Sequence, residues 1–179
     1  YGVSKAALIR FTETLAAETQ PYGIAVLAAH PGTVRTPMSE YAATSPEILK
    51  RAPLVQQWFQ ELFAEGGDTP MKQAVAFMLA VASGQADALS GCYVGVDDDL
   101  AALVAQAEAI QRALAAEIEL AGVPDGYVYE ELAEIAVARG DLEAAAPWAA
   151  KAHALLKDDR GVTPARLARL DRVARGIAP

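Results

Sequence analysis

Apolar residues recur every three or four positions over the first twenty residues of the chain. This spacing predicts an amphipathic helix, which Pro21 and Gly23 bring to an end. The apolar run at 24–29 has the length of a strand and no polar alternation, as expected of a strand that is buried on both faces. A similar run at 91–96 predicts a second strand. The apolar positions of the helix are Val3, Ala7, Leu8, Phe11 and Leu15.

The segment 46–83 separates the two predicted strands. It is long enough for a helical crossover, so the strands are expected to be parallel. Its first part predicts one or two helices with an apolar face that consists of Leu54, Trp58, Phe59, Leu62 and Phe63. Its second part predicts a further helix with a buried stripe that consists of Val75, Met78, Leu79 and Ala82.

Three consecutive acids at 97–99 precede another predicted helix. An aspartate at a helix N-cap accepts a hydrogen bond from a free N–H group and complements the helix dipole. Consecutive residues on a helix do not converge on one point. The only histidines, His30 and His153, lie in different segments. The acids therefore predict a helix cap, and no metal site is expected.

The segment 123–179 predicts two helices that meet at Gly140–Asp141, followed by a third helix. The first two resemble a tetratricopeptide repeat, with signature positions at Tyr129, Leu132, Ala133, Gly140, Ala145 and Ala152. Trp148 is expected on or near the inner face of this hairpin. In the third helix the residues expected to point inward are Leu167, Leu170 and Val173. Its four arginines, at every third position, predict a solvated face: Arg166, Arg169, Arg172 and Arg175.

The first residues carry the candidate chemistry. Tyr1 and Lys5 are four residues apart and would lie on one face of the first helix. A cation within about 4–6 Å of a phenol favours its ionised form, although the same spacing occurs on many solvated helices. Two motifs resemble the short-chain dehydrogenase/reductase family. Tyr1, Ser4 and Lys5 resemble its Y-x-x-S-K helix. The loop HPGTVRTPM at 30–38 resembles its P-G-x-V-x-T motif through Pro31, Gly32, Val34 and Thr36.

The resemblance implies a role for each of these residues. Tyr1 would be the general acid/base that exchanges a proton with a carbonyl or hydroxyl oxygen. Lys5 would hold the nicotinamide ribose hydroxyls and assist Tyr1. Pro31, Gly32, Val34 and Thr36 would bind the nicotinamide end of NAD or NADP. The implied substrate is a small carbonyl compound or alcohol, and the intact enzyme would be a homo-oligomer.

The implied fold class is α/β. Residues 1–122 would form the C-terminal half of a doubly wound, parallel, Rossmann-like sheet, and 123–179 an all-α segment. No G-x-x-x-G-x-G turn occurs in the chain, and the family's catalytic serine and asparagine precede its tyrosine. The chain is therefore expected to be a truncated fragment without activity of its own. The residue that chooses between NAD and NADP would also lie upstream.

Charge and composition narrow the alternatives. The net charge is −8, without the basic excess that nucleic-acid binding needs. No apolar run is long enough to span a membrane, and the composition suggests a cytoplasmic location. The single Cys92 is expected to be a small buried hydrophobe. Two functions remain open: an oxidoreductase, or a non-catalytic module whose helical tail binds a protein partner.

Overall fold

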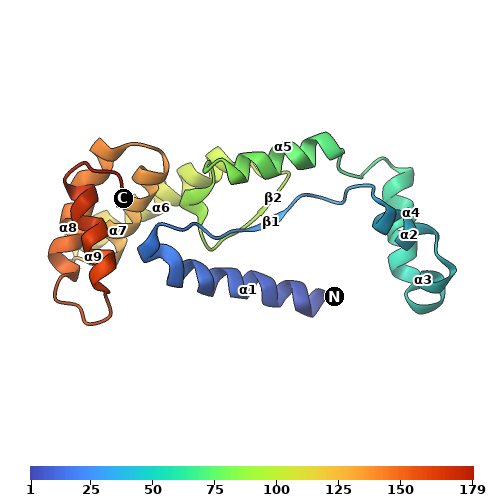
Figure 1. Cartoon of the computed structure of the whole chain (residues 1–179), viewed down its shortest axis with the longest axis horizontal. Helices are drawn as coiled ribbons and strands as arrows, with labels where there is room; N and C mark the ends of the chain where they lie inside the picture. Colours follow the sequence, from blue (N-terminus) through green and yellow to red (C-terminus); the bar gives the residue numbers. More distant parts are fainter. The chain divides into compact units, whose positions relative to one another are not determined.

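The computed structural model describes all residues, 1–179, and is mostly helical with one small sheet (Figure 1). The chain forms two compact units. The first unit comprises 1–28, 81–94 and 98–179, and the second comprises 29–80 and 95–97. The sequence predicted a boundary between a dehydrogenase-like part, 1–122, and a helical part, 123–179. This boundary stays a prediction. None of the helices combines the length and apolarity that a bilayer-spanning segment needs.

The first predicted helix is present as α1 (Gly2–Thr19). It is followed by the 3₁₀ turn η1 (Gln20–Tyr22), and Gly23 then adopts a left-handed conformation with a φ of 67°. The side of α1 that is buried carries Thr12 and Ala16. The expected apolar face is exposed instead, with Val3, Leu8 and Phe11 at 86%, 51% and 60% exposure.

The two predicted strands are present, and they are parallel, but each is shorter than the apolar run that predicted it. Strand β1 (Ala28–His30) pairs with β2 (Tyr93–Gly95). The Ala28 amide donates to the Cys92 carbonyl at 3.0 Å, and the His30 carbonyl accepts from the Val96 amide at 2.9 Å. Two strands do not make a doubly wound sheet, which stays a prediction for a complete domain.

The connection between the strands is helical. It contains α2 (Pro37–Thr44), α3 (Pro46–Arg51), α4 (Pro53–Ala64), α5 (Met71–Ala82) and the 3₁₀ turn η2 (Asp87–Leu89). The 46–64 segment thus forms two helices, within the range of the prediction. Leu54 and Trp58 of α4 are exposed, whereas Gln56 is buried and donates from Nε2 to the Ser45 carbonyl at 2.9 Å.

The predicted buried stripe of α5 is wrong in this chain. Val75, Met78 and Leu79 are exposed at 49%, 44% and 65%. Ala74 and Phe77 are buried in their place. Because α5 carries apolar residues on both sides, its periodicity predicts a helix without fixing the side that packs.

Residues 98–179 form four helices, each with a side-chain cap at its start. They are α6 (Leu100–Leu120), α7 (Gly126–Ala138), α8 (Leu142–Leu156) and α9 (Pro164–Ala174). Asp99 caps α6 by accepting from the Ala102 amide at 3.0 Å, as the acidic run predicted. Gly140 turns the chain between α7 and α8 with a φ of 75°.

The predicted hairpin and the packing of the third helix on it are confirmed. Leu170 and Val173 of α9 are each 1% exposed within a core that α7 and α8 share. Leu167 packs against this core. The Trp148 ring stacks on Tyr129 with centroids 5.9 Å apart. The hairpin is therefore part of the fold, whereas its identity as a tetratricopeptide repeat stays a prediction.

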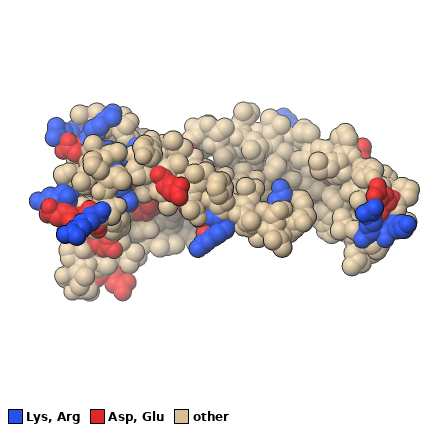
Figure 2. All heavy atoms as spheres, turned by 60° about the horizontal axis from the view of Figure 1, so that its bottom comes forward, with Lys and Arg blue, Asp and Glu red and all other residues tan.

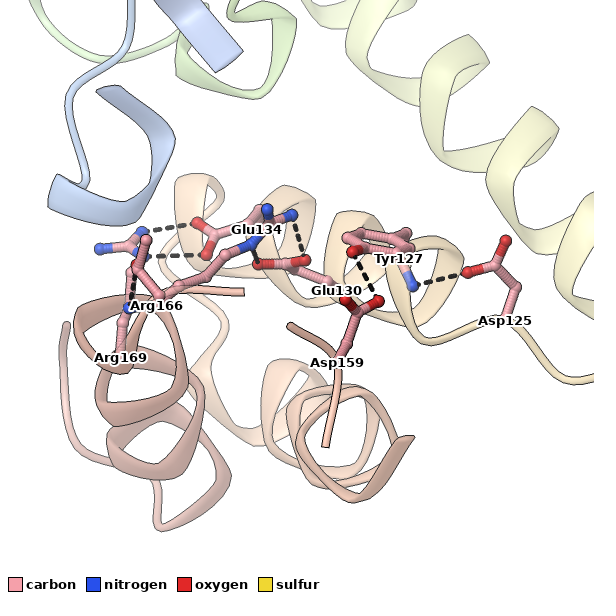
Figure 3. A network of polar contacts seen from close by, with 8 residues as sticks. Asp125, Tyr127, Glu130, Glu134, Asp159, Arg166 and Arg169 are labelled. Carbon is pink, nitrogen blue, oxygen red and sulfur yellow. Dashed lines mark hydrogen bonds and ion pairs between the residues drawn. The ribbon is translucent and has the colours of Figure 1, made fainter. Parts of the chain in front are cut away.

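The arginine face of α9 is not simply solvated, and that prediction is corrected for two of its four residues. Arg166 forms a bidentate pair with Glu130, with both distances 2.5 Å. Arg169 forms another with Glu134, at 2.9 and 2.5 Å. Figure 3 shows both guanidinium groups aimed at the carboxylates of α7. The two arginines that are buried are therefore those with a glutamate partner on α7, some 35 residues earlier in the chain.

Cys92 also differs from the prediction. It lies immediately before β2 and is exposed as a residue. Partial desolvation nevertheless raises the pKa of its thiol, and the charges of Glu131 and Glu13 add to this effect.

Candidate functional site

The predicted catalytic pair lies at the start of α1. Tyr1 is the N-cap of this helix, and the Lys5 amide donates to the Tyr1 carbonyl at 3.0 Å. This first helical turn sets both side chains on one side, with Lys5 Nζ 5.3 Å from the centroid of the Tyr1 ring. Ser4 Oγ donates to the Tyr1 carbonyl at 2.7 Å. Tyr1 is 96% exposed, so its phenol is accessible.

The predicted nicotinamide loop follows β1 and is held by its neighbours in the second unit. Gly32 has a φ of 82°, and a Cβ there would lie 2.0 Å from Thr69 Oγ1. Val34 forms a parallel bridge with Thr69, whose amide donates to the Thr33 carbonyl at 2.9 Å. Only glycine fits this close approach without strain, so the motif glycine has a clear structural role.

Thr36 ends the loop as the N-cap of α2. Its amide donates to Ser39 Oγ at 2.8 Å, and its own Oγ1 accepts from the Ser39 amide at 3.4 Å. This reciprocal arrangement is a capping box with serine in place of the usual glutamate. Ser39 Oγ also donates to the Val34 carbonyl at 2.9 Å. Ser39 therefore positions two of the four predicted cofactor-binding residues of this loop, Val34 and Thr36.

Arg35 anchors the middle of the loop. Its guanidinium lies 4.3 Å from the centroid of the Phe63 ring and donates to the Phe63 carbonyl at 3.3 Å. It also pairs with Asp68, 3.5 Å away. The loop is thus attached to α4 and to the segment that precedes α5.

The two parts of the predicted site belong to different compact units of the structure. Tyr1, Ser4 and Lys5 belong to the first unit, whereas Pro31, Gly32, Val34 and Thr36 belong to the second. Tyr1 and Lys5 are brought together as predicted, and the loop residues share one short, ordered turn. No group of three or more metal-ligating side chains occurs in the chain.

Each unit by itself supplies part of the chemistry that the resemblance implies. In the first unit, Tyr1 and Lys5 present an accessible phenol and an ammonium group on one side of α1. In the second unit, Ser39 holds the backbone of the loop in place. The pyrophosphate of a nicotinamide cofactor rests on a glycine-rich turn at a helix N-terminus, and no such motif occurs in the 179 residues.

Two contributors escaped the sequence analysis. Ser39 could have been found from Thr36, since a polar residue three positions after an N-cap is the signal of a capping box. Thr69 had no such signal, because its contact with Gly32 joins positions far apart in the chain.

Comparison with protein families gives one match. The model described as short chain dehydrogenase matches residues 1–47, a stretch that contains both Tyr1–Lys5 and the 31–36 loop. Comparisons with curated proteins and with solved structures found no match. The family match supports the interpretation of this part of the chain as a fragment of a short-chain dehydrogenase, an oxidoreductase at the level of the family.

Proposed function

We propose that the chain carries the C-terminal part of a catalytic domain that transfers hydride between NAD or NADP and a carbonyl or hydroxyl substrate. The observation that carries this proposal is the Tyr1–Lys5 pair, which α1 sets on one accessible face within the stretch that matches the dehydrogenase family.

Tyr1 is the proton donor and acceptor in this proposal. In the reductive direction its phenol gives a proton to the substrate oxygen, and in the oxidative direction it accepts one. Lys5 stands beside the ring and stabilises the negative charge that the phenol develops. The bound cofactor supplies or accepts the hydride, and the protein contributes position and electrostatics.

The loop 31–36 orients the nicotinamide ring. The Val34 backbone and the Thr36 hydroxyl are the proposed contacts, since Ser39 and Thr69 hold the loop in a fixed shape. A loop fixed in advance lowers the entropic cost of bringing cofactor and substrate together.

Substitution of Tyr1 tests the catalytic assignment when the chain is assayed together with a cofactor-binding half that supplies the glycine-rich turn. Tyr1→Phe is expected to abolish turnover and to leave cofactor binding largely intact, because only the exchangeable proton is removed. Lys5→Met is expected to weaken both. Tyr22→Phe, at another exposed tyrosine, is the matched control and should keep normal turnover. Normal turnover of Tyr1→Phe would refute the assignment.

The chain as given is proposed to be inactive. Without a glycine-rich turn it has no seat for the pyrophosphate, so a fluorescence titration with NADH or NADPH is expected to show no saturation. Saturable binding by the chain alone would overturn this part of the proposal. The catalytic role of Tyr1 would still be tested separately by the turnover of Tyr1→Phe.

A further inference from the structure

Three glutamates of α7 differ in their surroundings. Glu130 and Glu134 are each held by an arginine of α9 (Figure 3). The carboxylate of the partly buried Glu131 has neither a hydrogen bond nor an ion pair. Burial raises the pKa of the Glu131 carboxyl, and the charges of Glu134 and Glu130 raise it further, whereas the charge of Arg166 lowers it.

Glu131 lines a cavity of about 1250 Å³ that lies entirely within the first unit. One wall of this cavity is α7, which also contacts η2. The opposite walls come from α1, from the turn at 20–25 and from the segment 83–93. The cavity is thus lined both by α7 and by elements that precede it in the chain.

The ionisable groups around this cavity leave Glu131 without a balancing charge. Glu13 on α1 is already paired with Arg10. The one basic side chain in the lining, Arg169, is already held by Glu134. An ionised Glu131 therefore adds a negative charge that no free basic group in the lining balances. The ionisable groups that line the cavity with it are Glu13, Tyr22, Asp87, Cys92, Tyr93, Glu134 and Arg169.

One of these groups, Cys92, responds to the acidic surroundings, and Asp87 responds to burial alone. The charges of Glu131 and Glu13 both raise the pKa of the Cys92 thiol, after the larger effect of burial. Burial also raises the pKa of the Asp87 carboxyl. Glu131 of α7 and Glu13 of α1 therefore act on the same side chain from opposite walls of the cavity.

We propose that Glu131 makes the packing of α7 against η2 sensitive to pH, so that protonation of Glu131 strengthens this packing and ionisation weakens it. The carboxyl is then an acid-responsive group beside the contact between α7 and η2. The proposal goes beyond the catalytic role of Tyr1 and does not depend on it.

The direction of the pH effect follows from linkage. The pKa of Glu131 in the packed state lies above the ordinary value of 4.5, so the packed state binds the proton more tightly than the separated state does. The electrostatic penalty is complete above the raised pKa. It is relieved as the pH falls through that value toward the ordinary one.

Amide hydrogen exchange on the intact chain tests the proposal. Protection is measured at a series of pH values from about 4 to about 8, which runs from near the ordinary carboxyl pKa upward, and is corrected for intrinsic exchange. The reporting amides are those of Leu89 and Gly91, which donate to Ala86 and Val26. The amides of α8 serve as the internal reference for the hairpin itself.

Glu131→Gln is expected to raise the protection of the reporting amides several-fold at the high end of the pH range and to remove most of its pH dependence. Glu131→Lys, which places a cation opposite Glu13 and Asp87, should protect them at least as well. Glu117→Gln, at an exposed glutamate of α6, is the matched control and should behave like the parent chain.

Three results would overturn the proposal. The first is an unchanged pH dependence in Glu131→Gln. The second is unchanged protection of the reporting amides at the high end of the pH range in both Glu131 variants. The third is a loss of protection in both variants that extends to α8, because removal of an unbalanced charge should not destabilise the hairpin.

Discussion

The two ion pairs between α7 and α9 show how a single residue can depend on a distant partner. The Glu130 side chain is 3% exposed, and that of Arg166 is 18% exposed. A charge this deeply buried is tolerated only when it is paired and hydrogen-bonded. Both carboxylate oxygens of Glu130 accept from Arg166, so the pair satisfies this condition.

Arg166→Met is therefore expected to destabilise the chain by about 3–5 kcal/mol, because it leaves the buried Glu130 carboxylate without a partner. The measurement is urea unfolding followed by circular dichroism. Arg175→Met is the matched control on the same helix. Its pair with Asp171 is exposed on both sides, so its loss should change the free energy of unfolding by less than about 1 kcal/mol.

A double variant separates the buried charge from simple packing. Glu130→Leu combined with Arg166→Met removes both charges and should be more stable than Arg166→Met alone. Equal stability of the single and double variants would mean that the lost contacts of the arginine stem, rather than the orphaned carboxylate, account for the effect.

Residues that act through local spacing were the ones that sequence could predict. Tyr1 and Lys5 meet because they are one helical turn apart, and Asp99 caps α6 through its near neighbour Ala102. The buried state of Arg166 could not be predicted in this way, because it depends on Glu130, which lies far away along the chain.

At the scale of the elements, the loop after β1 depends on one glycine. Gly32→Ala would place a Cβ 2.0 Å from Thr69 Oγ1, at a φ of 82°. Gly66 lies in the same unit at a φ of 67° with no atom within 4 Å of its would-be Cβ. The two glycines therefore separate the cost of backbone strain from the cost of a steric clash.

Gly66→Ala is expected to cost about 1–2 kcal/mol through backbone strain alone. Gly32→Ala should cost clearly more, because Thr69 must also move and its bridge with Val34 is disturbed. Amide hydrogen exchange of Thr69, which donates to Thr33, reports the local effect. Similar exchange in the two variants would show that the loop adapts to a side chain.

Helix positions were predicted well, because capping residues and apolar periodicity act locally. Which face of a helix is covered was predicted poorly. In α5 the sequence offers two apolar sides, and Phe77 rather than Met78 is buried. The strands are shorter than their apolar runs, since strand length depends on paired neighbours, and β1 and β2 have only each other.

At the scale of the whole molecule, many large hydrophobic side chains are exposed, although the chain has a net charge of −8. On the face in Figure 2, acidic and basic side chains are mixed over the tail helices, and large areas elsewhere carry neither. Val3, Leu8 and Phe11 form an exposed apolar stripe on α1. Exposed stripes of this kind are typical of surfaces that associate.

We therefore expect the isolated chain to self-associate, with an average mass in sedimentation or light scattering that rises with concentration. Phe11→Lys should reduce this association, because it places a charge in the middle of the α1 stripe. Ala6→Lys is the matched control: it adds the same charge to the same helix at an exposed position outside the stripe, and should leave the association largely unchanged. Equal effects of the two lysines would mean that net charge controls association, and a strictly monomeric parent chain would show that the exposed stripe does not drive it.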